Sequence, residues 1–257
     1  MAVRKLFIMV FGCVVLFFAG NEVFAVNITT TTSYVSRYIW RGQDLSYQND
    51  PVVQSSVDVA FPKLIEAIDV SMNVWNSTPL KDGHVTTEEL DYSLTLSRSC
   101  MDKVKVTSGY VYFDYPRLDQ YSDINEVWGS LTWCKIPYLP IDISATVLGA
   151  YEFEAASDGP ENGWYYSWGF NTVLPLPDCK IFQNGQNISL GLTNWGNDGV
   201  GGLKPSRLYA TDLSATTSYS FKKFTITPGF YYTINHVEQI NSGDSELWGS
   251  ISVSYAF

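Results

Sequence analysis

Apolar and polar residues alternate along most of the chain from about residue 27 onward. Successive residues of a β-strand point to opposite faces, so a period of two predicts strands with one apolar and one polar face. The pattern is clearest at the C-terminus, where Ile251, Val253, Tyr255 and Phe257 share one face and serine or alanine occupies the positions between them. The alternation therefore predicts an all-β fold.

The alternation divides the chain into twelve segments separated by polar connections. Each segment is long enough for a tilted strand that crosses a bilayer, which needs about 9–11 residues. The predicted strands cover residues 29–41, 52–61, 66–76, 88–98, 103–113, 123–135, 141–153, 161–173, 186–195, 206–220, 223–235 and 244–257.

The connections between these segments differ in length. Every second connection is long and polar (42–51, 77–87, 114–122, 154–160, 196–205 and 236–243), and those between them are mostly short. Long outer loops that alternate with short periplasmic turns are typical of bacterial outer-membrane barrels, which also have an even number of strands. A soluble β-sandwich would show similar residue alternation but gives no reason for this regular change in loop length. We therefore predict a transmembrane antiparallel up-and-down β-barrel of about twelve strands.

The N-terminus resembles an export signal rather than part of the barrel. Arg4 and Lys5 precede an apolar run over residues 6–19, and residues 23–25, Val-Phe-Ala, fit a signal-peptidase site. The run is shorter than the roughly 20 residues that a transmembrane helix needs. We expect residues 1–25 to be a cleaved signal peptide, residues 26–257 to form the barrel, and the protein to reside in the bacterial outer membrane.

Partners follow from the two ends of the chain and from its charge. The terminal Phe257, with Ile251, Val253 and Tyr255 at alternate positions before it, resembles the signal read by the barrel-insertion machinery. Loss of residues 1–25 would change 16 basic and 26 acidic residues to 14 and 25, a net charge of −11. A nucleic-acid partner is therefore not expected, because such proteins present a basic face. We expect outer-membrane lipid and the insertion machinery as partners.

Residues 36–42, Ser-Arg-Tyr-Ile-Trp-Arg-Gly, followed by Ser46, Pro51, Gln54 and Asp58, resemble the start of the TorF-type porins, a family of mostly uncharacterised outer-membrane proteins. The Tyr-x-Trp-Arg-Gly core is the most specific part. The sequence departs from the family at residues 55–56, where Ser-Ser replaces a usual glycine pair. The resemblance covers about 25 residues of the chain. It implies a barrel with pore function and supplies no catalytic residues.

Alternation also predicts which charged residues face the lumen. Arg37 and Arg41 alternate with aromatic residues, and we expect them to point into the lumen near the outer mouth and to pair with carboxylates such as Asp58 or Glu89. Further lumen candidates are Asp91 and Glu152. Aromatic residues gather toward strand ends, where we expect them to form interfacial girdles; they are Tyr38, Trp40, Trp75, Tyr110, Tyr112, Trp128, Trp133, Tyr151, Trp164, Tyr209, Trp248 and Tyr255.

The cysteines and histidines give little evidence for chemistry. Cys100, Cys134 and Cys179 fall on predicted periplasmic connections, so a Cys100–Cys134 or a Cys134–Cys179 disulfide is compatible with the topology, as are unpaired thiols. No cysteine or histidine has the spacing of a metal site. Asp82 with His84, or Ser242 with His236, could be read as a catalytic pair, but neither lies on a recognisable motif. We expect no catalytic residues, metal or cofactor.

Charge and lumen size suggest a passive role. Acidic residues concentrate in the long connections and lysines around the short ones, which would enrich cations at the outer mouth, although ordinary solvated loops explain the same pattern. A twelve-stranded barrel has a narrow lumen. We predict a monomeric porin-like channel for small hydrophilic solutes or ions, with a preference for cations. The alternatives are a non-conducting structural or adhesive surface barrel and, as a third reading, a barrel hydrolase.

Overall fold

The computed structural model describes residues 26–46, 50–65, 67–81, 88–100, 103–118, 122–137, 139, 141–155, 162–176, 186–200 and 203–257. Among these residues, no helix is long and apolar enough to cross a membrane. The expected signal peptide, residues 1–25, lies outside the described residues.

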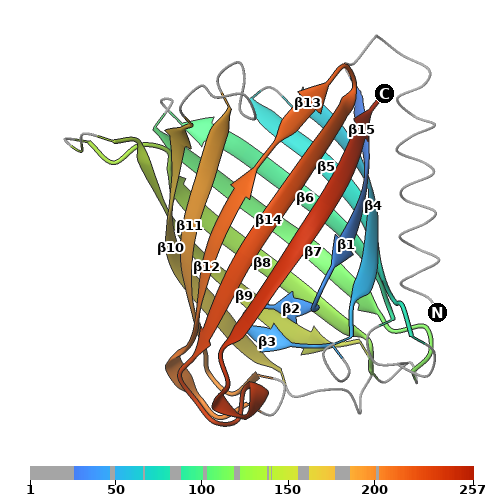
Figure 1. The fold of residues 1–257 in the computed structure, drawn as a ribbon, viewed down its shortest axis with the longest axis vertical. Helices are drawn as coiled ribbons and strands as arrows, with labels where there is room; N and C mark the ends of the chain where they lie inside the picture. Colours follow the sequence, from blue (N-terminus) through green and yellow to red (C-terminus); the bar gives the residue numbers. More distant parts are fainter. Residues whose placement is uncertain are drawn as a thin grey trace.

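Antiparallel strands form one closed wall (Figure 1). Each wall strand pairs with its neighbours in sequence order, and the first pairs with the last, which closes the barrel. β12 and β13 both pair with β14 and act as a single wall strand interrupted at Ser218, so the wall has the twelve strands that the sequence predicts. The strands are β1 (Asn27–Val35), β4 (Val52–Ile65), β5 (Ile68–Pro79), β6 (Glu89–Cys100), β7 (Val104–Asp114), β8 (Ile124–Trp133), β9 (Ile143–Glu154), β10 (Gly163–Pro175), β11 (Asn187–Asn197), β12 (Ser206–Thr217), β13 (Tyr219–Phe221), β14 (Phe224–Asn235) and β15 (Glu246–Ala256).

Apolar side chains cover the outer face of the wall. They occupy alternate strand positions and are exposed although they are large, up to 71% for Phe221 and Leu247, as expected where hydrocarbon rather than water surrounds the barrel. The predicted C-terminal face agrees, because Ile251, Val253 and Phe257 point outward. The Phe257 N–H also donates a hydrogen bond of 3.0 Å to the Ile28 carbonyl across the seam between β15 and β1.

Connection lengths follow the predicted alternation only in part. At one end of the barrel, 66–67, 101–103 and 222–223 are short, but 134–142 and 176–186 are about as long as the connections at the other end, which are 36–51, 80–88, 115–123, 155–162, 198–205 and 236–245. The C-terminus lies at the end that carries the short turn between β13 and β14 (Figure 1). If both termini of the barrel lie in the periplasm, as we expect, the connections at the end that carries the lumen hairpin would face the cell exterior.

The first strand ends earlier than the sequence predicts. Alternation continues to Trp40, but β1 ends at Val35, and the chain then leaves the wall. Residues 36–46 turn into the barrel and form a short hairpin of β2 (Ile39–Trp40) and β3 (Gln43–Asp44), which lies inside the outline of the wall near the end with the long connections (Figure 1). We call residues 36–46 the lumen hairpin. The positive φ angles of Arg41 and Gly42 make its turn.

Candidate functional site

Arg41, at the tip of the lumen hairpin, holds the hairpin to the far wall. Its Nη2 atom lies 2.6 Å from Oε2 of Glu126 on β8, and its Nη1 atom lies 3.5 Å from Oε1 of Glu152 on β9. The guanidinium also stacks over the Trp40 and Tyr165 rings, 4.2 and 4.9 Å from their centroids. All of these side chains are largely enclosed, so the ion pairs are little screened by water.

The base of the lumen hairpin is attached near the seam of the barrel. Arg37 forms an ion pair with Glu246, the first residue of β15, and lies 3.8 Å from Asp44 of β3. The Tyr38 hydroxyl donates a 2.6 Å hydrogen bond to Glu89 on β6. Burial, together with the nearby Glu89 carboxylate, raises the pKa of Tyr38 well above its ordinary value, so the phenol remains the donor in this bond.

The other side of the lumen hairpin packs against β9, β10 and β12. Gly42 lies against Ala210, where a Cβ atom on the glycine would stand 2.3 Å from the alanine Cβ. The Tyr209 hydroxyl donates to the Arg41 carbonyl at 2.8 Å, and Asn241 bonds to the backbone of both Gly42 and Asp44. Neighbouring residues of a regular strand point to opposite faces, yet Tyr209 and Ala210 are both buried against the hairpin. The register between β11 and β12 shifts nearby, an irregularity that allows both side chains to face inward.

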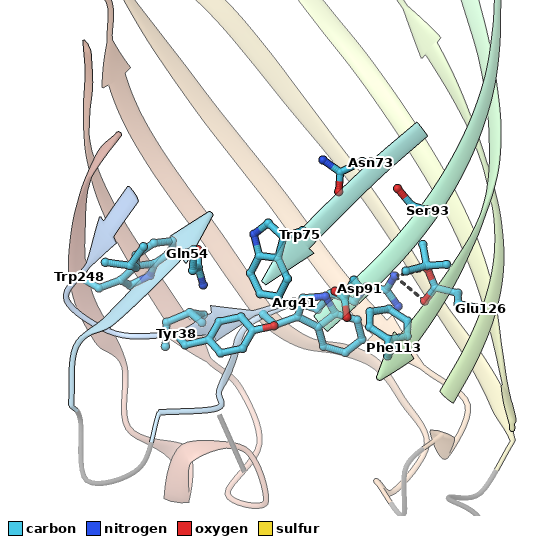
Figure 2. Close-up of a pocket in the computed structure, with 14 residues that line it drawn as sticks. Tyr38, Arg41, Gln54, Asn73, Trp75, Asp91, Ser93, Phe113, Glu126 and Trp248 are labelled. Atoms are coloured by element: carbon cyan, nitrogen blue, oxygen red, sulfur yellow. Dashed lines mark hydrogen bonds and ion pairs between the residues drawn. The ribbon is translucent and has the colours of Figure 1, made fainter. Parts of the chain in front are cut away.

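A cavity of about 430 Å³ lies beside the lumen hairpin. The lumen hairpin closes its outer end, and side chains of β1, β4–β8 and β15 form its walls (Figure 2). Five aromatic side chains line it, and among the polar lining residues are Gln54, Asn73, Asp91 and Ser93. The aromatic lining residues are Tyr38, Trp40, Trp75, Phe113 and Trp248.

A second cavity of about 160 Å³ lies against Gln43, Glu89, Tyr115 and Glu152. Trp40 and Phe113 line both cavities, with their rings 5.9 Å apart and edge to face. Trp40 and Phe113 therefore lie between the two cavities.

The structure brings several predicted lumen residues together. Arg41, Glu89, Asp91 and Glu152 all surround the lumen hairpin, and Arg37 lies at its base. The predicted partners of the arginines were wrong in detail, because Arg41 pairs with Glu126 and Glu152, and Arg37 with Glu246. Asp58 instead accepts hydrogen bonds from Asn73 (2.6 Å) and Ser56 (3.0 Å) on the wall. The error follows from treating residues 36–41 as wall, which placed their side chains beside the next strand rather than across the lumen.

The predicted aromatic girdles are only partly present. Trp133, Tyr151, Trp164 and Tyr255 lie on the outer face, as predicted, and so do Tyr110 and Tyr112. The other half of the predicted set faces the lumen, because those residues share strand parity with lumen carboxylates or belong to the hairpin. These inward residues are Tyr38, Trp40, Trp75, Trp128, Tyr209 and Trp248.

Two lumen residues that the sequence analysis missed were within its reach. Glu126 alternates with Val127, and its face continues through Trp128 and Thr132, so strand parity alone places it opposite the lipid. Asp212 shares a face with Ala210 and accepts hydrogen bonds from Trp195 Nε1 and Thr233 Oγ1, both 2.7 Å long.

The described cysteines, Cys100 and Cys134, lie at the end of the barrel opposite the lumen hairpin. Cys100 and Cys134 are free thiols, so the structure does not contain the disulfide between them that the topology allows. Cys179 lies outside the described residues. His236 Nε2 lies 2.9 Å from the Thr211 hydroxyl, and the Asp82–His84 pair falls outside the described residues.

Comparison with known proteins gives the fold. No protein-family model and no curated protein sequence matches the chain. Among solved structures, the KdgM porin is 7% identical with a TM-score of 0.51, and covers 89% of this chain and 99% of its own. LpxR from Salmonella typhimurium is 8% identical with a TM-score of 0.54, covering 88% and 99%. The COG4313 outer membrane channel from Pseudomonas putida F1 is 9% identical with a TM-score of 0.51, covering 93% and 97%.

The fold is that of outer-membrane β-barrels. At these identities the likeness extends to the fold alone. It includes proteins described as a porin and as a channel, and it supplies no residue of the lumen site.

Proposed function

We propose that this chain is a bacterial outer-membrane channel through which small hydrophilic solutes diffuse passively, with a preference for cations. An apolar outer face and a polar interior suit a closed barrel in lipid around an aqueous path. The fold shared with proteins described as porins and channels supports the same conclusion. The Tyr-x-Trp-Arg-Gly motif extends the proposal to membership of the TorF-type porin family.

The cation preference rests on one observation, the charge balance around the lumen hairpin. The carboxylates Glu89, Asp91, Glu126 and Glu152 gather around a single guanidinium, that of Arg41. Glu89 and Asp91 are hydrogen-bonded to each other and share a proton, which leaves the group with a smaller but still net negative charge. In a narrow lumen with low-dielectric walls, such an excess of negative charge attracts cations and repels anions. The neighbouring charged group consists of Arg37, Glu246 and Asp44, so its one positive charge does not offset the carboxylates around Arg41.

Reversal potentials in planar bilayers test this proposal. Under a potassium chloride gradient, the purified barrel should conduct with potassium more permeant than chloride, and Glu89→Gln should reduce that preference. Asp142→Asn is the matched control, because that exposed carboxylate pairs with Lys135 away from the hairpin. An anion preference, or equal effects of the two substitutions, would contradict the cation selectivity.

A non-conducting surface barrel is the second candidate, and one observation favours it. The lumen hairpin lies within the barrel and is fixed on two sides by ion pairs, so it obstructs part of the lumen. A folded barrel that carries no current under any applied voltage would support this candidate against the channel. Heat-modifiable migration on gels would confirm that the protein tested is folded.

A further inference from the structure

We propose that the 430 Å³ cavity beside the lumen hairpin is a binding site for an organic cation, a substituted ammonium or guanidinium solute. The inference rests on the proposed channel function, because it names the solute class that the path would take. It goes further than cation selectivity, because it names a defined site that binds a fixed number of cations. A negative potential in the lumen would not by itself produce such a site.

The aromatic walls carry the first part of the argument. Trp75 and Trp248 stand on different walls of the cavity, and Tyr38 lies beneath them with its ring 5.7 Å from that of Trp75 (Figure 2). Trp248 is held in place by stacking on Tyr231, with ring centroids 3.9 Å apart. Aromatic faces attract alkylated cations through their negative quadrupole. Small inorganic ions keep their water shells and gain less from such walls.

The charge of the cavity carries the second part. Arg41 is already engaged by Glu126 and Glu152, so the cavity wall keeps Asp91 as an additional carboxylate. The carboxyl groups of Asp91 and Glu89 are hydrogen-bonded to each other, so they share a proton and carry one negative charge between them. Oδ1 of Asp91 is shielded from solvent, and no N–H or hydroxyl group of the described residues donates to it. Such an orphaned acceptor is costly, and a cationic donor beside it would relieve the cost.

The remaining polar groups fit the same ligand class. Gln54, Asn73 and Ser93 line the cavity and can accept N–H or O–H hydrogen bonds from a solute (Figure 2). The volume lies within the range of small-molecule sites, about 300–1,000 Å³. A neutral sugar would also stack on the tryptophans, but it would leave the excess negative charge uncompensated. An anion would be repelled by the carboxylates.

Equilibrium dialysis of labelled tetraethylammonium against the folded, detergent-solubilised barrel tests the site without requiring conduction. We expect saturable binding of about one cation per barrel. Trp75→Leu and Asp91→Asn should each weaken binding about tenfold, the size of a cation–π contact or a single charge in an enclosed site. Heat-modifiable migration verifies that each variant is folded, and the isosteric Asp91→Asn keeps the test valid if Trp75→Leu fails to fold.

Matched controls separate the site from general attraction. Trp164→Leu removes an outward tryptophan, 49% exposed, and Asp142→Asn removes a carboxylate far from the cavity, so neither should alter binding. Three results would each overturn the proposal. The first is displacement of the labelled cation by sodium chloride as effective as displacement by unlabelled tetraethylammonium. The others are saturable binding of glucose instead, and no saturable binding at all. A barrel that binds tetraethylammonium but carries no current would contradict the channel function and still support the binding site. Failure of the channel proposal can therefore be distinguished from failure of the binding-site proposal.

Discussion

Gly42 of the lumen hairpin lies directly against Ala210 of β12, with no room for a Cβ atom between them. The glycine also has a φ of +79°, which side-chain-bearing residues rarely adopt. The contact lets the hairpin pack closely against β12. The space between the hairpin and the other strands therefore depends on this contact.

Gly42→Ala should therefore displace the hairpin from β12. Overpacking of this kind costs about 1–3 kcal/mol, enough to shift the hairpin rather than unfold the barrel. We expect a changed single-channel conductance with a normal heat-modifiable band. Gly149→Ala is the control, because its Cβ would meet only Trp164, at 3.9 Å. Identical conductance of Gly42→Ala and the unmodified protein would show that the position of the hairpin against β12 does not determine the conductance.

Arg41→Gln should destabilise the barrel, because it leaves two enclosed carboxylates without their cation. The removal of one partner from a buried pair costs about 3–5 kcal/mol. The double variant Arg41→Gln with Glu126→Gln should recover part of that loss, since it removes one of the carboxylates.

Guanidinium unfolding in lipid vesicles would measure both changes in the free energy of unfolding. Lys135→Gln serves as the control, because it breaks an exposed pair with Asp142 that contributes at most about 1 kcal/mol. A loss for Arg41→Gln no larger than the control would mean that the lumen carboxylates are compensated in another way.

Asp212→Ala should weaken the wall between β11, β12 and β14. The indole N–H of Trp195 and the hydroxyl of Thr233 would both lose their acceptor. Each donor left unpaired inside the lumen costs about 1–3 kcal/mol unless water replaces the carboxylate. The midpoint of guanidinium unfolding should fall for Asp212→Ala. It should fall less for Asp212→Asn, because the amide oxygen of the asparagine still accepts one hydrogen bond.

Alternation in the sequence is sufficient to predict the wall but not what lies within it. Strand parity places Ile251 and Phe230 outside and Glu89 and Asp91 inside, because one face must contact lipid. It fails at residues 36–41, whose alternation continues although the chain has left the wall. Inside the lumen, a hairpin has the same period of two as a wall strand. Only contacts with strands far along the sequence distinguish them.

The aromatic residues show the same limit. Trp164 and Trp248 both lie in alternating segments, and a membrane girdle is a common use of such residues. Trp248 faces inward because its neighbours Leu247 and Gly249 take the outer positions, a feature that parity could have revealed. The tight stacking of Trp248 on Tyr231 could not be predicted, because it depends on the register between β14 and β15.

Deletion of Phe257 should reduce assembly in the outer membrane. The residue carries the last position of the expected insertion signal, and its N–H donates to Ile28 across the seam. We expect a smaller fraction of heat-modifiable protein in outer-membrane extracts. Phe221→Ala is the control, since that outward phenylalanine is 71% exposed and lies away from the seam. Equal assembly of the deletion and the control would exclude a role for the terminal residue.

The ion pair between Arg37 and Glu246 joins the base of the hairpin to β15, the last strand in the sequence. The Asp44–Asn241 bond likewise spans nearly the whole sequence. Contacts of such long range form late, because the intervening chain must first be ordered. Docking of the hairpin would then be the final event of biogenesis, and a nascent barrel would remain unobstructed until its edges had met.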